Sequence, residues 1–213
     1  MIKMSFWMPV AKKFFVTGGR ASGETRKGTV QEAFIKARIN QCNLVPVSSV
    51  LDPYAIQLSA PPAIPHGAIT FCVMAEELGT KGCSIAAGVG WCYMKSRDGT
   101  VKKAYVVEDH GHKEERAVKE TLMFSLIQMA EAENLVIFNP VNPDETLMNR
   151  PEWAEQQAVL GKRFDGWKSP EREFLKYLEE KAENFFKFEI KGFDKVPEDF
   201  GYAVAALVFV FEV

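Results

Sequence analysis

Three long apolar runs constrain the fold of this chain most, because none of them alternates between apolar and polar residues. The runs cover residues 68–75, 83–94 and 202–211. A strand that is apolar on both faces must be covered on both sides, by a second sheet or by helices. We therefore expect the last run at the centre of its sheet. Gly88 and Gly90 in the second run indicate a bulge or the close approach of another backbone.

Shorter strands are predicted at residues 14–17, at 103–108 and in the segment that starts at Asn43. Pro46 lies in that last segment and cannot donate a ladder hydrogen bond, so an edge strand or a bulge is expected there. Strands in two groups with helices outside them indicate a layered α+β sandwich.

The helices are predicted from apolar spacing and from capping residues. Residues 30, 33, 34 and 37 recur at helical spacing, and Thr29 with Glu32 is typical of a capping box at the helix start. A second helix is predicted at about 112–133, with Asp109 as its cap. Ser169 and Pro170 open a third, which extends to about residue 184, and residues 153–160 hold at most a short helix.

Composition favours one domain that folds without disulfides or metal. The chain has 213 residues, of which 47% are hydrophobic and 25% charged. A net charge of −2 offers no basic field for nucleic acid or an anionic membrane, so small molecules or proteins are the expected partners. Four cysteines without a C-x-x-C pair indicate free thiols in a reducing compartment. Residues 1–11 do not resemble a signal peptide, and no apolar stretch is long enough to span a bilayer, so a cytoplasmic location is expected.

The serine pair Ser48-Ser49 follows an apolar strand and precedes a turn at Asp52-Pro53. If the Ser49 hydroxyl attacked the Ser48 carbonyl, the peptide bond would become an ester. β-Elimination would then cut the chain, and hydrolysis of the dehydroalanine would leave a pyruvoyl group at position 49. The plain alternative is a polar loop opening, which Ser-Ser before a Pro turn commonly forms.

Other sequence patterns do not point to a metal or a nucleotide. His110 and His112 are too close in sequence to share a helical face, and His66 lies between Pro65 and Gly67 in a loop. A zinc site needs more ligands than this spacing supplies, so no metal is expected. Gly18-Gly19 and Gly88-x-Gly90 form neither G-x-G-x-x-G nor a P-loop.

Several short stretches together resemble the pyruvoyl-dependent arginine decarboxylases. They are residues 15–19, 23–25, 43–44 with 48–49, 65–68, 84–87, 107–111 and 201–206. The resemblance covers roughly residues 13–136 and 186–211. It fails over about 139–184, which we interpret as an insertion within a single domain rather than a second domain.

The resemblance implies a fold and an activity. The expected fold is a four-layer αββα sandwich, and the expected enzyme is a lyase that cleaves itself into residues 1–48 (the β chain) and 49–213 (the α chain). Its cofactor is then the pyruvoyl group derived from Ser49, without pyridoxal phosphate or metal. A Schiff base to that group would decarboxylate arginine to agmatine, a reaction of polyamine biosynthesis. The family forms trimers with sites between subunits, so a homotrimer or a dimer of trimers is expected.

The resemblance also assigns roles to individual residues. Asn43 would polarise the Ser48 carbonyl or hold the oxyanion, because alternation along one strand would bring it near Ser49; the alternative is a bond to local backbone. Glu108 would donate the proton to the carbanion, with partial desolvation raising its pKa. The alternative for Glu108 is a solvated strand end. Gly18 and Gly19 would line the substrate pocket.

Gln31 is a departure from the family pattern. An ungapped count from Gly23-Glu24-Thr25 places the acidic residue that holds the guanidinium on Gln31. An amide supplies neither the charge nor the two-point geometry that a guanidinium favours. Glu32 points about 100° away on a helix, and the predicted capping role already occupies it. Two alternatives therefore stay open. One is a pyruvoyl decarboxylase of another amino acid, or of arginine held differently, and the other is an unprocessed scaffold or binding protein without catalysis.

Overall fold

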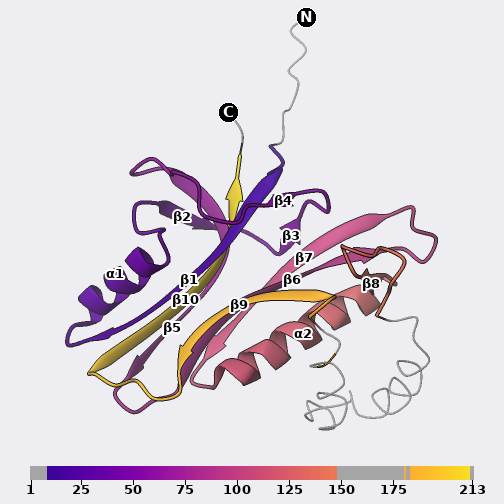
Figure 1. Ribbon diagram of the computed structural model, residues 1–213. Coiled ribbons are helices and arrows are strands. Elements are labelled where there is room, and N and C mark those ends of the chain that lie inside the picture. The colour runs from indigo at the N-terminus through magenta and orange to yellow at the C-terminus, as the bar shows by residue number, and fades with distance from the viewer. Residues whose placement is uncertain (1–8, 148–179, 181–182, 212–213) are drawn as a thin grey trace, which may run out of the picture.

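The computed structural model describes residues 9–147, 180 and 183–211. These residues form an α+β fold with two helices and two sheets (Figure 1). The first sheet contains, in spatial order, β2 (Asn43–Pro46), β5 (Ile69–Thr80), β10 (Phe200–Val210), β1 (Lys13–Gly23) and β4 (Ile56–Gln57). The second contains β3 (Val50–Leu51), β7 (Lys102–Gly111), β6 (Ile85–Lys95) and β8 (Val136–Phe138), and β9 (Phe186–Phe193) also pairs with β6.

Each helix contacts its own sheet. Helix α1 (Arg26–Lys36) packs on β1 and β10 of the first sheet, and helix α2 (Glu115–Ala132) packs on β6 and β7 of the second. Figure 1 shows α1 beside the first sheet and α2 beside the second. The amphipathic pattern of both helices therefore serves to cover one sheet face each.

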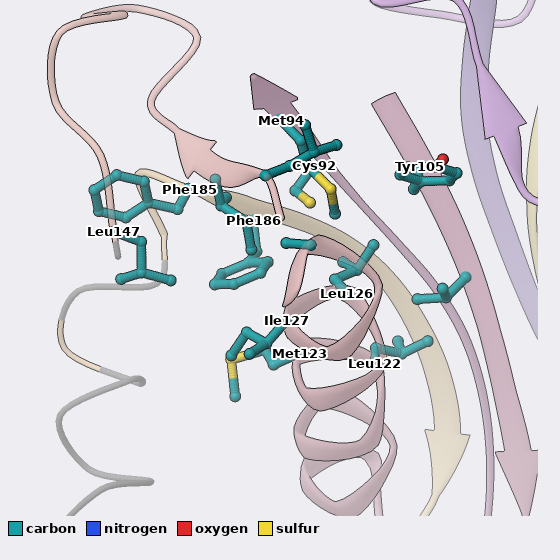
Figure 2. Close-up of a cluster of buried hydrophobic side chains, with 14 of the residues drawn as sticks. Cys92, Met94, Tyr105, Leu122, Met123, Leu126, Ile127, Leu147, Phe185 and Phe186 are labelled. Atoms are coloured by element: carbon teal, nitrogen blue, oxygen red, sulfur yellow. The ribbon is translucent and has the colours of Figure 1, made fainter. Parts of the chain in front are cut away.

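Separate apolar clusters hold these elements together. One cluster lies between the two sheets and includes Phe14 and Trp91, whose rings meet edge to face at 6.1 Å. A second lies under α1 around Phe15. A third lies between α2 and the second sheet, where Figure 2 shows Leu122 and Leu126 of the helix facing the strands. Burial on both faces explains why the strands carry long apolar runs.

The strand predictions are confirmed in their main points. Strand β10 lies between β5 and β1, and β2, which contains Pro46, is an edge strand. A Cβ added to Gly88 would lie 2.8 Å from Val118 Cγ1 of α2. A Cβ added to Gly90 would lie 3.0 Å from Phe188 Cδ1. Both glycines thus mark close packing against side chains on the face of β6 that α2 covers. The predicted bulge or close backbone is not found there, because the pairing of β6 with β7 is unbroken and the nearest atoms belong to side chains.

The predicted start of the first helix is wrong. Thr25 is the N-cap, and its hydroxyl accepts a hydrogen bond from Gly28 N at 3.3 Å. Thr29 is buried one turn later and donates to Thr25 O at 2.8 Å. Glu32 forms an ion pair with Lys36 at 2.7 Å instead of completing a capping box. The apolar spacing placed the core face of the helix correctly but not its polar first turn.

The second helix also begins later than predicted. It starts at Glu115 after the N-cap Glu114, which makes no side-chain capping bond. Asp109 does not cap this helix, because it lies within β7 and its carboxylate accepts a bond from Lys113. The predicted short helix at 153–160 and nearly all of the third predicted helix lie outside the described residues. No helix in the described part of the chain has the length and apolar character needed to cross a membrane.

Candidate active site

The serine pair lies where the backbone passes from one sheet to the other. Strand β2 belongs to the first sheet and ends at Pro46, and strand β3 belongs to the second sheet and begins at Val50. Residues 47–49 make the crossing. Ser48 is exposed and Ser49 is half-buried. The serine pair is therefore a link between two packed sheets rather than a free surface loop.

Three backbone hydrogen bonds hold this crossing, each with a nitrogen to oxygen distance of 2.9 Å. Val47 N donates to Cys72 O on β5 in the first sheet, and Val106 N on β7 in the second sheet donates to Ser49 O. The third bond lies within the crossing itself, from Val50 N to Ser48 O. The Ser48 carbonyl is thus held between two anchored points.

The pairing of β3 with β7 places Glu108 close to the serine pair along the chain of β7. Val50 is opposite Tyr105, and Ser49 O bonds to Val106 N, so Glu108 follows two residues further along the same strand. Two residues of strand span about 7 Å. Val106 belongs to the cluster between the sheets, and Glu108 shares its face. The Glu108 residue is exposed in the single chain, so this chain alone does not supply the predicted desolvation.

The side-chain hydrogen bond of Asn43 points away from the serine pair. Its side-chain amide donates to Gly67 O at 2.8 Å, at the start of β2. Strand β2 ends at Pro46, so the alternation that would have placed Asn43 and Ser49 on one face does not extend to Ser49. The bond from Asn43 goes to backbone 24 residues away in sequence, so it is neither the predicted contact with Ser49 nor a bond to local backbone.

An open pocket of about 570 Å³ adjoins Ser48. Its walls are mostly apolar, and its lining residues are Pro9, Val10, Ala11, Val47, Ser48, Val50, Leu51, Asp52, Pro53, Phe71, Phe209 and Phe211. Burial would raise the pKa of Asp52, but hydrogen bonds from the Lys12 ammonium and from Tyr54 N hold it below its usual range. Asp52 is therefore an ionised and already paired carboxylate. Glu108 and Gln31 do not line this pocket.

The two glycines of the predicted substrate pocket face opposite sides of β1. Gly19 faces α1, and a Cβ there would lie 2.1 Å from Ala33 O. Gly18 faces β9, where a Cβ would lie 2.8 Å from Lys191 Cγ and 2.9 Å from Glu189 Oε1. Helix packing thus explains Gly19, whereas Gly18 lies under the Lys191 and Glu189 ion pair.

Gln31 lies on the exposed side of α1, and the buried residues of that helix are Thr29 and Ala33. Helix α1 packs on β1 and β10, whereas the serine pair links β2 to β3. The structure therefore brings Ser48, Ser49 and Glu108 together. It does not bring Gln31 to them within one chain.

Other reactive groups near the site have ordinary structural roles. Burial, with smaller effects from Cys42 and Glu76, raises the pKa of the Cys72 thiol to about 11, so this thiol is protonated near neutral pH. His110 Nδ1 lies 2.7 Å from Glu77 Oε2 and so links β7 to β5 across the two sheets. Within the described ranges, no group of three or more His, Cys, Asp or Glu is arranged to hold a metal ion.

The sequence matches the model of a known protein family. The model of the pyruvoyl-dependent arginine decarboxylases (PvlArgDC) matches residues 13–213. The chain belongs to this family. A curated relative, the pyruvoyl-dependent arginine decarboxylase of Methanopyrus kandleri, is 36% identical over 72 residues, which are 34% of this chain. That match covers 47% of the relative, about half of its length.

Membership of the pyruvoyl-dependent arginine decarboxylase family confirms the resemblance drawn from the short sequence stretches. The matched span encloses residues 139–184, and the interpretation of that segment as an insertion stays a prediction. Sequence reasoning missed the amides of Val50 and Val106 and the bond between His110 and Glu77. A backbone amide has no residue signature, and the histidine pairing depends on how the two sheets pack.

The two glycines should differ in their tolerance of a methyl group. We expect Gly19→Ala to lower the free energy of unfolding by about 1–3 kcal/mol, because the added carbon meets helix backbone that cannot move alone. Gly18→Ala is the matched control, and its effect should be smaller because the Lys191 and Glu189 side chains can rotate away. Urea unfolding of both variants checks this. Equal losses would contradict a specific role of Gly19 in seating α1.

Proposed function

We propose that this protein is a pyruvoyl-dependent decarboxylase that cleaves itself between Ser48 and Ser49 and converts arginine to agmatine and CO2. The observation that carries the proposal is the position of the serine pair. It lies at an anchored crossing between two sheets, in a chain of a family named for both the cofactor and the reaction. The mature protein would consist of residues 1–48 and 49–213. We also infer the αββα order of layers for its fold.

The residues around position 49 suit a pyruvoyl group. Ser49 is half-buried and its carbonyl is bound by Val106 N, while Ser48 borders an open pocket. Once formed, the group supplies a ketone conjugated with an amide carbonyl, an electron sink for breaking the bond to the substrate carboxylate. Its formation from Ser49 requires one water molecule and releases the Ser49 nitrogen as ammonia.

Glu108 is the proposed proton donor, since it lies on β7 two residues beyond the amide that binds Ser49. A carboxyl that is protonated near neutral pH must be shielded from water. Glu108 is exposed in one chain, so we propose that a neighbouring subunit or the substrate covers it. Gly18 and Asn43 are proposed to contribute to the same site. Gly19 is proposed to act through its place under α1.

We propose a homotrimer or a dimer of trimers, with the site completed between subunits. Exposed apolar side chains surround the pocket beside Ser48: Val10, Val47, Val50, Phe71 and Phe211. Val50 is 64% exposed. A cluster of this kind is typical of an interaction surface. The four free cysteines support a reducing compartment, and we propose the cytoplasm.

Gln31 favours a second candidate, the decarboxylation of a different amino acid. The exposed amide of Gln31 stands where the ungapped count places the acidic residue. Glu32 is not a capping residue in the structure, but it is paired with Lys36. The substrate side chain is therefore the least supported part of the proposal.

Self-cleavage is the first prediction of the proposed function. Denaturing mass analysis of the purified protein should find residues 1–48 and 49–213, the larger piece without a free amino terminus. Ser49→Ala should remain a single chain, because it lacks the attacking hydroxyl. Ser96→Ala, a change in the loop between β6 and β7, should cleave normally. An intact wild-type chain with full decarboxylase activity would exclude the mechanism and leave another chemistry. An intact chain without activity would leave the scaffold interpretation.

The second prediction separates turnover from maturation. Glu108→Gln should still cleave but should decarboxylate roughly 100-fold more slowly, the usual scale for a lost general acid. Asp109→Asn is the matched control, because Asp109 lies next in the strand, points to the opposite face and pairs with Lys113. Its turnover should stay near that of wild type. Loss of cleavage in a folded Glu108→Gln protein would instead assign Glu108 to maturation.

The third prediction concerns substrate choice. If a neighbouring subunit brings Gln31 to the site and arginine is the substrate, Gln31→Asp should lower KM about tenfold or more, because a shielded bond between a carboxylate and a guanidinium adds about 1.5–3 kcal/mol. Gln31→Asn, which has the shape of the aspartate without its charge, should not lower KM. Release of CO2 from a panel of amino acids measures both. Arginine activity that falls in Gln31→Asp but survives in Gln31→Asn would show that Gln31 is not the guanidinium site.

A further inference from the structure

A tight turn places a hydrogen-bond donor on the carbonyl that self-cleavage would attack. Val50 N donates to Ser48 O at 2.9 Å, a bond between residues i+2 and i that defines a γ-turn centred on Ser49. Arg38 and Asn134 are the described non-glycine residues with positive φ. Ser49 is not one of them, so the turn is of the inverse type, the common form.

The Val50 amide is available because of its place in the sheet. Strand β3 is an edge strand of the second sheet, and Val50 is paired with Tyr105 on β7. In an antiparallel pair, alternate residues turn their amides away from the partner strand. The Val50 amide bonds to Ser48 and not to β7, so its bond to the Ser48 oxygen breaks no hydrogen bond between the strands.

The turn is also held from outside. The amide before the serine pair, Val47 N, is tied to Cys72 O in the first sheet, and Ser49 O is tied to Val106 N in the second. Little reorganisation is then needed when charge develops on the Ser48 oxygen. Fixed donors of this kind are the means by which enzymes stabilise acyl-transfer intermediates.

We propose that the backbone N–H of Val50 is the oxyanion donor of self-cleavage, an inference that rests on the proposed function. In the first step, Ser49 Oγ bonds to the Ser48 carbonyl carbon, and negative charge develops on the Ser48 oxygen. The bond from that carbon to Ser49 N then breaks, and the hydroxyl proton goes to this nitrogen, which leaves an ester and a free amine. The hydrogen bond from Val50 N strengthens when its acceptor becomes charged, so it favours the intermediate over the amide.

The Asn43 amide is the competing donor, and its contacts differ. It bonds to Gly67 O, just before β5, whereas Val50 N already donates to the Ser48 oxygen. A backbone donor at Val50 does not depend on the side chain at this position. Exposure of the Val50 side chain does not matter for this role.

The test replaces one atom in the full chain. Valine 50 is exchanged for its α-hydroxy acid by nonsense suppression, which converts the N–H to an ester oxygen and keeps the side chain. Cleavage between residues 48 and 49, followed by mass analysis over time, should slow about 100- to 1000-fold, the scale for loss of one oxyanion donor. Fragment masses distinguish this cut from hydrolysis of the new ester between residues 49 and 50.

The matched control is the same exchange at Val47, whose amide makes a bond of equal length beside the serine pair but does not reach the Ser48 carbonyl. It should slow cleavage only a few-fold, and the urea midpoints of both variants should be alike. Wild-type cleavage rates in the Val50 variant, or equal slowing in both, would overturn the inference. So would normal cleavage of the Val50 variant together with no cleavage of Asn43→Ala. An intact wild-type chain would instead refute the proposed function.

Discussion

The passage of the backbone between the two sheets at residues 47–49 is the constraint on which the site depends. Packed sheets lie about 10 Å apart, and the four chain steps from Pro46 to Val50 reach at most about 14 Å. The bonds to Cys72 O and from Val106 N fix both ends of this short crossing. A serine pair with little slack on either side can be held in one geometry, and an exposed loop of the same sequence could not.

The face of β7 that looks toward the other sheet explains why a carboxyl lies near this crossing. Along it, Ala104 and Val106 are buried in the cluster between the sheets, and the next residues on that face are Glu108 and His110. The face therefore changes from apolar to polar just beyond the contact with Ser49. His110 closes the edge by bonding to Glu77 on β5. The Glu108 carboxyl thus lies at the edge of the core, where a neighbouring subunit or the substrate can cover it.

Helix α1 depends on a different contact, the close approach of Ala33 O to Gly19. This contact turns Thr29 and Ala33 to the sheet and leaves Gln31 and Glu32 on the outer side. Within one chain, this outer side therefore does not reach the pocket beside Ser48. Glu32 does not cap α1, so capping is no reason against a role of Glu32 in binding the guanidinium. Its carboxylate forms an ion pair with Lys36 instead.

Local sequence patterns determined the strands, the core face of α1 and the candidate serine pair, because apolar periodicity and residue chemistry act over short stretches of chain. The pairing of Ser49 with Val106, the bond of Asn43 to Gly67 and the true cap of α1 were decided only by tertiary structure. Register between distant strands follows from packing of residues far apart in sequence, and backbone amides are chemically alike at every position. For that reason the sequence could name the reactive serines but could not show which amide lies on the Ser48 carbonyl.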